Sequence, residues 1–168
     1  FMGKGDKESA EQTLGNCFTT QIVVSLLLTL ILFTGNKSFL MAFGASENTI
    51  PYAVAYMNIY SLGTIFVQLT LGMNAFITAQ GFAKTSMLSV LVGAASNIIL
   101  DPIFIFALHM GVRGAALATI VSQALSCTWV LHFLMGKKSY LKIRRCNMKL
   151  KKDIILPSLA LGLSTFIM

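Results

Sequence analysis

Four long stretches without a charged side chain constrain this sequence more than any other feature. No Asp, Glu, Lys or Arg occurs from Cys17 to Thr34, or between Glu47 and Lys84, and two similar apolar stretches follow. A helix needs about 20 mostly apolar residues to cross the hydrocarbon core of a bilayer. The pattern predicts membrane-spanning helices at about 13–34, 53–79, 87–108 and 114–135.

The composition agrees with a chain that folds in lipid. Charged residues make up 11% of the 168 residues and hydrophobic ones 55%, with a mean hydropathy of +0.75. An ordinary soluble domain carries roughly 25% charged residues, and one of this length could not bury so much apolar surface. We therefore expect an all-α polytopic membrane protein, an antiparallel bundle of transmembrane helices.

The sequence offers nothing that predicts an enzyme. It contains no Ser/His/Asp set, no metal-ligand spacing and no glycine loop placed to bind phosphate. The three cysteines, Cys17, Cys127 and Cys146, have no metal spacing, and we expect free thiols.

The positive charge is concentrated in one place. Of the thirteen Lys and Arg residues, eight fall in the loop 137–153, whereas the turns predicted on the opposite side of the membrane hold only Lys37 and Arg113. Cytoplasmic loops of membrane proteins carry such an excess of Lys and Arg. We therefore expect a plasma membrane protein, in the bacterial cytoplasmic membrane, with this basic loop in the cytoplasm. A juxtamembrane cluster of this kind does not indicate a nucleic-acid partner.

The stretch "SNIILDPIFIF" places one aspartate, Asp101, well inside the third predicted span. Such a residue costs about 2.5–3.5 kcal/mol near the centre of a membrane helix. Asn97 lies at i−4 on the same helix face, and Pro102 has no N–H to donate to the carbonyl of Ile98. These oxygens together suit a proton or a small hard cation; the alternative is an aspartate at the membrane interface.

Small and polar residues indicate how the spans pack. Ser89 and Gly93 are four residues apart, as are Gly114 and Ala118, which predicts close packing of the third span against the fourth. The second span carries several polar side chains, for which hydrogen bonds between helices are one interpretation: Tyr56, Asn58, Gln68 and Asn74.

Several motifs, taken in order, resemble the multidrug and toxic compound extrusion (MATE) family. "NIILDPIFIF" followed by "GVRGAALATIVSQ" carries most of the resemblance. "NAFITAQGFAKTSM" is similar to the family's segment between helices four and five, and "MGKGDKESAEQTLGN" to the approach to helix three. The resemblance places the chain, as a piece of a longer protein, at helices three to six and the start of helix seven. Residues 1–136 would then belong to the first lobe, 137–153 to an inter-lobe loop and 154–168 to the second lobe.

The resemblance implies a two-lobe, twelve-helix antiporter that exports organic, often cationic compounds, driven by protons or sodium ions. It implies a site for the coupling ion at Asp101, Asn97 and Thr119, with a sodium ion at Asp101 where sodium is used. A carboxylate on helix one, outside this chain, completes that site in the family. Tyr56 and Asn74 would face the substrate cavity, and we expect Pro102 to be a helix kink. The partners would be the lipid bilayer, small organic substrates and the remaining helices, with no cofactor beyond the coupling ion.

Three alternatives stay open at this stage. The Thr119 hydroxyl could instead bond to the carbonyl four residues earlier. The protein could be a lipid-linked oligosaccharide flippase of the same superfamily, although the predicted spans contain none of the basic residues that such proteins tend to carry in the cavity. It could also be a truncated membrane fragment that transports nothing.

Overall fold

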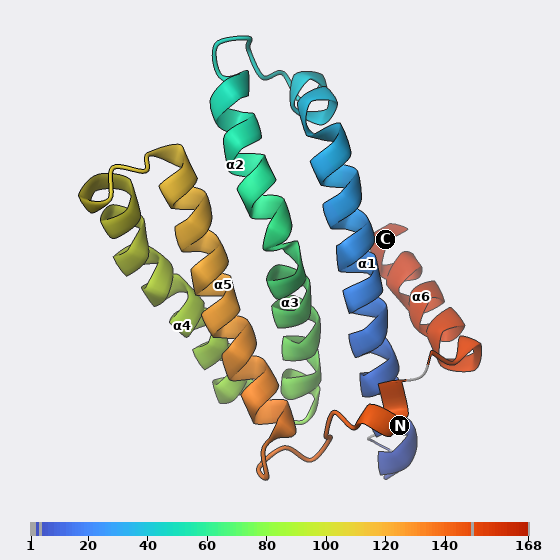
Figure 1. Ribbon diagram of the computed structural model, residues 1–168. Helices are drawn as coiled ribbons and strands as arrows, with labels where there is room; N and C mark the ends of the chain where they lie inside the picture. The colour runs from blue at the N-terminus through green and yellow to red at the C-terminus, as the bar shows by residue number, and fades with distance from the viewer. Residues whose placement is uncertain (1–2, 4, 149, 168) are drawn as a thin grey trace.

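The structure is a computed structural model that describes residues 3, 5–148 and 150–167. All regular structure in this part of the chain is helical, as the sequence predicted (Figure 1). The long helices are α1 (Lys7–Ala42), α2 (Ile50–Leu62), α3 (Thr64–Ala79), α4 (Ala83–Pro102), α5 (Val112–Met135) and α6 (Lys152–Ile167). Two short ones are the π-helix η2 (Ile103–Ala107) and the 3₁₀-helix η3 (Arg145–Met148).

Helix α1 is longer than a bilayer is thick. Its 36 residues correspond to about 54 Å, against a hydrocarbon core of about 30 Å. It begins six residues before the predicted position 13, where the Asp6 carboxylate accepts a hydrogen bond from the backbone N–H of Ser9 at 3.1 Å and caps the helix. The polar first turns of α1 can therefore extend out of the membrane.

The segment predicted as one span at 53–79 consists of two helices. α2 and α3 meet at Gly63 with a bend of 52°. At the break, the Thr29 hydroxyl of α1 donates to the carbonyl of Ser61 at 2.9 Å, which satisfies a backbone group at the bend. If this pair counts as one span, the described residues contain four spans long and apolar enough to cross a membrane.

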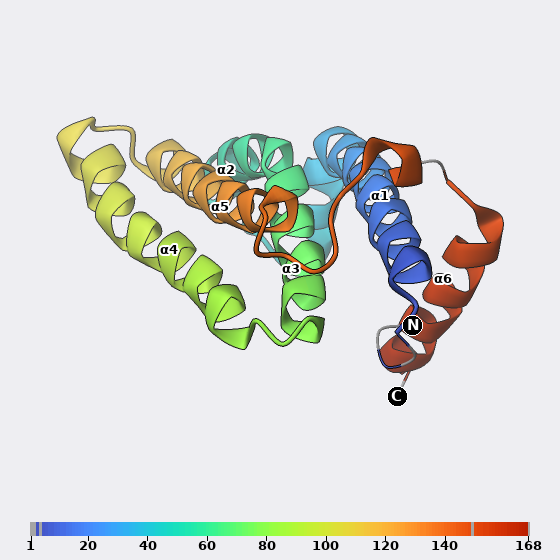
Figure 2. The same cartoon turned by 90° about the horizontal axis from the view of Figure 1, so that it is seen from below.

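Successive spans run in opposite directions, and α4 lies against α5 while α3 lies between α5 and α1 (Figures 1 and 2). The main buried apolar cluster lies toward the end of the bundle where α3 and α5 finish and α1 begins. It includes one residue from the segment after α5. Its members are Ala10, Leu14, Met73, Ile77, Val130, Leu134 and Leu141.

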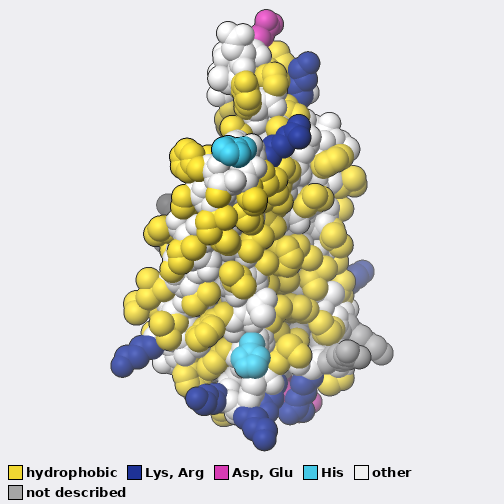
Figure 3. All heavy atoms as spheres, turned by 60° about the vertical axis from the view of Figure 1, so that its left-hand side comes forward, with side chains coloured by type: hydrophobic (Ala, Val, Ile, Leu, Met, Phe, Trp, Pro, Cys, Tyr) yellow, Lys and Arg dark blue, Asp and Glu magenta, His cyan; other side chains and the backbone are white. Residues whose placement is uncertain are grey.

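The outside of the bundle suits lipid. Figure 3 shows a broad apolar surface over the middle of the molecule, with Lys and Arg side chains gathered toward its two ends. Large apolar side chains such as Ile98 and Phe106 are 72% and 70% exposed. The assignment of residues 1–136 and 154–168 to two lobes remains a prediction.

Candidate cation site and adjoining cavity

Asp101 lies in the last turn of α4, where it is half-buried and faces Asn97. The amide Nδ2 of Asn97 donates to Oδ1 of Asp101 at 3.3 Å, as their i, i+4 spacing on one helix face allows. Because the amide nitrogen is the donor in this bond, the Oδ1 atom of Asn97 remains an acceptor. The structure thus brings together two of the three residues that the resemblance assigned to the cation site.

The helix changes its geometry immediately after Asp101. Pro102 is followed by the π-helix η2, in which the N–H of Leu108 donates to the carbonyl of Ile103 at 2.9 Å. The carbonyl of Ile98 has no N–H available from Pro102. Single π-turns within helices often mark functional sites. The structure thus shows a change from α- to π-geometry after Pro102, and the kink at Pro102 stays a prediction.

The helix that carries Asp101, α4, packs closely against α5, and so does the following η2. The hydroxyl of Ser126 donates to the carbonyl of Ser89 at 2.6 Å, and a Cβ added at Gly93 would lie 3.3 Å from the Cβ of Ser126. A Cβ at Gly114 would lie only 2.6 Å from the carbonyl oxygen of Phe104. Glycine at this position lets α5 touch the backbone of η2, as the small residues predicted.

Thr119 is not hydrogen-bonded to Asp101. Its hydroxyl donates to the carbonyl of Ala115 at 2.9 Å, which is the local bond that the sequence analysis left open. The lone pairs of its oxygen remain free to accept. Thr119 and Asn97 line one cavity, and Asp101 lies one turn beyond that lining along α4.

This cavity lies between α3, α4 and α5 and has a volume of about 230 Å³. Thr70 and Ser122 are 5% and 2% exposed, and their hydroxyls have no hydrogen-bond partner among the described residues. Neither residue was predicted from the sequence, although Thr119, Ser122 and Ser126 share a helix face at i, i+3 and i+7. The lining residues are Thr70, Leu71, Val90, Gly93, Ala94, Asn97, Thr119, Ser122, Gln123 and Ser126.

The resemblance assigned Tyr56 and Asn74 to the substrate cavity, and the structure gives each of them a defined neighbour. Tyr56 stacks on Tyr60 of the same helix, with ring centroids 5.8 Å apart. Asn74 donates through Nδ2 to the carbonyl of Ser86 at 3.3 Å, and its Oδ1 has no partner among the described residues. Neither residue lines the cavity between α3, α4 and α5, so their role in substrate binding remains a prediction.

The side chains that could act as ion ligands here offer oxygen atoms, which suit a hard cation. Within the residues that the structure describes, no three His, Cys, Asp or Glu side chains gather as metal ligands, and all three cysteines are free thiols. The Asp101 carboxylate, the Asn97 amide oxygen and the Thr119 hydroxyl are oxygen ligands of the kind that hard cations prefer. The chain itself supplies one carboxylate to such a site.

Known proteins resemble this chain in sequence and in fold. Residues 1–103 match the MatE family. The chain is 31% identical over 149 residues to "Multidrug export protein MepA" of Staphylococcus haemolyticus (strain JCSC1435), a match that covers 89% of this chain and 33% of MepA. The chain thus spans about a third of the length of this relative.

Two solved structures with 26% sequence identity, described as the inward-facing and outward-facing conformations of a multidrug resistance MATE family transporter of the MOP superfamily, match 96% of this chain. The TM-scores are 0.90 for the inward-facing structure, of which 37% is covered, and 0.88 for the outward-facing one, of which 36% is covered. The family match extends over more than half of the chain, and the fold agrees with it throughout the helical bundle. The chain therefore belongs to the MatE family of membrane transporters.

Proposed function

We propose that this chain is part of an antiporter that exports small organic, often cationic compounds across the bacterial cytoplasmic membrane in exchange for protons or sodium ions. Its membership of the MatE family and its similarity to a multidrug export protein support this proposal. The basic loop 137–153 faces the cytoplasm, which is the side that the excess of Lys and Arg favours.

The observation that carries the proposal is the pairing of Asp101 with Asn97 beside the π-turn. A carboxylate within an apolar helix is costly, and a single neutral amide offsets only part of that cost. A bound proton or sodium ion removes the unbalanced charge. Asp101 therefore alternates between an ion-loaded and an ion-free form, and Asn97 holds the carboxylate in place in both.

Ion binding affects the rest of the protein through the backbone next to Asp101. An ion shifts an equilibrium between two conformations only if it binds one more tightly than the other. The geometry of η2 depends on the bond between Leu108 and Ile103 and on the contact of Gly114 with Phe104. A charge change at Asp101 acts on this irregular segment directly, so ion occupancy favours one conformation of the outer end of α4.

The adjoining cavity fits an organic compound better than an anionic lipid-linked sugar. Its lining combines apolar side chains with hydroxyls and amides, and none of its lining residues is Lys or Arg. A flippase substrate with phosphate groups would require positive charge there. The lining thus supports the exporter over the flippase.

The test is the substitution Asp101→Asn in the complete transporter, reconstituted in vesicles with an imposed proton or sodium gradient. Gradient-driven efflux of a fluorescent organic cation should be lost, because an amide does not gain and lose a proton at ordinary pH and brings no negative charge to balance a sodium ion. The control is Asp153→Asn, which removes an exposed carboxylate at the start of α6. Undiminished efflux by the correctly inserted Asp101→Asn protein would contradict the proposal.

A further inference from the structure

The strap, residues 137–148 together with 150 and 151, lies between α5 and α6 and is packed against the bundle. The resemblance predicts an inter-lobe loop at 137–153, which includes this stretch. In the structure it runs beneath the bundle from the end of α5 to the base of α1 (Figures 1 and 2). Ser139 and Leu141 are 4% and 1% exposed, and Leu141 belongs to the main apolar cluster. A segment with this burial is held in one place.

One anchor comes from the end of α3. The side-chain oxygen Oε1 of Gln80 accepts hydrogen bonds from the hydroxyl of Ser139 and from the backbone N–H of Leu141, both at 2.9 Å. Gln80 therefore holds the first part of the strap by its backbone as well as by a side chain.

A second anchor comes from the first turns of α1. The side chain of Asn16, which is fully buried, accepts a hydrogen bond from the backbone N–H of Lys151 at 2.7 Å and donates to the carbonyl of Asn147 at 3.3 Å. A Cβ at Gly15 would lie 2.5 Å from the carbonyl oxygen of Asn147. Only glycine at this position lets the strap lie this close to α1.

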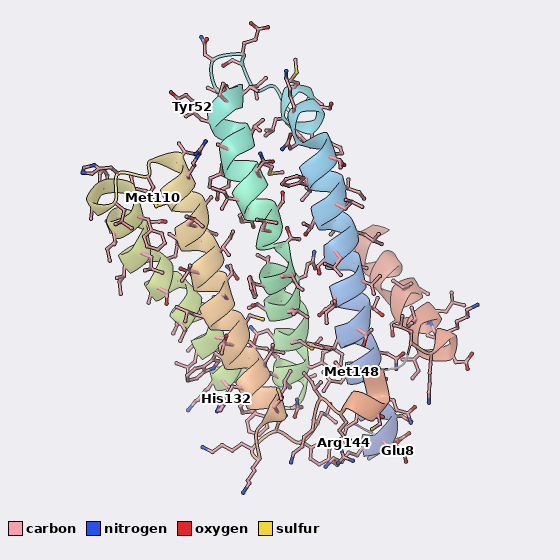
Figure 4. The ribbon with its side chains drawn as sticks, in the orientation of Figure 1. Glu8, Tyr52, Met110, His132, Arg144 and Met148 are labelled. Carbon is pink, nitrogen blue, oxygen red and sulfur yellow. The ribbon has the colours of Figure 1, made fainter. Side chains whose placement is uncertain are left out.

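Two further residues on the same face of α1, Glu11 and Thr19, make three contacts with the strap. Glu11, 5% exposed, accepts a hydrogen bond from the backbone N–H of Lys142 at 3.4 Å and pairs with Nε of Arg144 at 3.2 Å. The hydroxyl of Thr19 donates to the carbonyl of Met148 at 2.9 Å. Figure 4 shows Arg144 and Met148 at the base of α1, where these contacts form.

We propose that the strap stays docked on α1 and α3 throughout transport, so that movement between the lobes begins no earlier than Lys151. Gly15, Asn16 and Gln80 are then positioning residues that set where α6 starts. Beyond the last anchor, α6 packs mainly on α1 and contains Pro157, which interrupts its backbone hydrogen bonding. The mechanical role, though not the docking, rests on the proposed function.

The docking is tested by hydrogen exchange of the Leu141 and Lys151 amides in the complete transporter, measured by mass spectrometry. Both amides should exchange slowly. Gly15→Ala should speed exchange of Lys151 about tenfold or more, because the added methyl group pushes the strap from α1. The control Gly3→Ala adds the same methyl group at a position where no atom of the described residues lies within 4 Å, and it should change neither exchange rate. Fast exchange at both amides in the unmodified protein would overturn the docking.

The persistence of docking is tested by locking the strap. In a protein whose native cysteines are replaced by serine, Thr19→Cys and Met148→Cys are joined with a short bifunctional thiol reagent. Efflux should continue after cross-linking at more than half the rate of the unlinked double variant. Loss of efflux only after cross-linking would show that the strap must detach, which overturns the proposal. Absence of efflux from the unmodified protein would count against the proposed function instead, and hydrogen exchange would still decide the docking.

Discussion

The anchors of the strap and the cavity between α3, α4 and α5 differ in how their buried polar groups are satisfied, although the Oδ1 of Asn74, next to Met73, also has no partner among the described residues. At the strap end of the bundle, the side chains of Glu11, Asn16 and Gln80 all have hydrogen-bond partners. In the cavity, the hydroxyls of Thr70 and Ser122 have none among the described residues. An unsatisfied buried polar group costs about 1–3 kcal/mol. Groups with partners thus hold the fold together, whereas those without are available to a substrate, an ion or water.

The largest expected effect is loss of packing at the strap end. Met73→Ala should lower the free energy of unfolding by about 3 kcal/mol, because Met73 is fully buried in the main apolar cluster. Met87→Ala, which truncates a 59% exposed side chain, is the matched control and should have little effect. Unfolding in bicelles with increasing denaturing detergent measures both. Equal losses for the two variants would mean that the strap end is not the stabilising core.

Replacing Gly114, where α5 meets η2, should lower the free energy of unfolding less than Met73→Ala does, but it should also reduce transport. Gly114→Ala should cost about 1–3 kcal/mol, since the new methyl group would meet the carbonyl of Phe104. The displacement of η2 should also weaken gradient-driven efflux. Gly162→Ala, on α6 at a position where no atom of the described residues lies within 4 Å, provides the control for both measurements. A stable Gly114→Ala protein with normal efflux would show that the position of η2 does not matter for transport.

The smallest expected effects concern Ser122 and Ser126 of α5, whose replacement by alanine should have different consequences. Ser126→Ala removes a hydrogen bond to the carbonyl of Ser89 and should cost about 0.6 kcal/mol, the average for such bonds in membranes. Ser122→Ala removes a hydroxyl that has no partner among the described residues, so stability should stay the same or rise. Its effect should instead fall on the binding of the exported cation, measured by fluorescence titration. A larger loss of stability for Ser122→Ala than for Ser126→Ala would contradict the claim that the hydrogen-bonded serine stabilises the fold more than the serine without a partner.

The sequence predicted features that depend on local pattern. Apolar length predicted the helical spans, and the i, i+4 spacing of Asn97 and Asp101 predicted their contact. The small residues around Gly93 and Gly114 predicted the packing of α4 on α5. Each of these follows from helix geometry and from the absence of water in a bilayer.

Features that depend on contacts distant in sequence were not predicted. The bend at Gly63 involves Thr29 of α1, and the strap is held by Asn16 and Gln80, which lie more than fifty residues before it. The run of basic residues in the strap indicated only a cytoplasmic loop, because charge says nothing about where backbone groups bond. The cavity required the spatial arrangement of three helices, so Thr70 and Ser122 could not be assigned to it from one sequence.

The most direct test of the central claim follows the Asp101 carboxyl group itself by infrared difference spectroscopy of the complete transporter. If the proposed function holds, adding an organic cation or changing the proton or sodium concentration should change a carboxyl or carboxylate band, because Asp101 gives up its proton or sodium ion in the proposed cycle. That band should disappear in Asp101→Asn and persist in Asp153→Asn. An identical difference spectrum in Asp101→Asn and in the unmodified protein would contradict the assignment of ion binding to this residue.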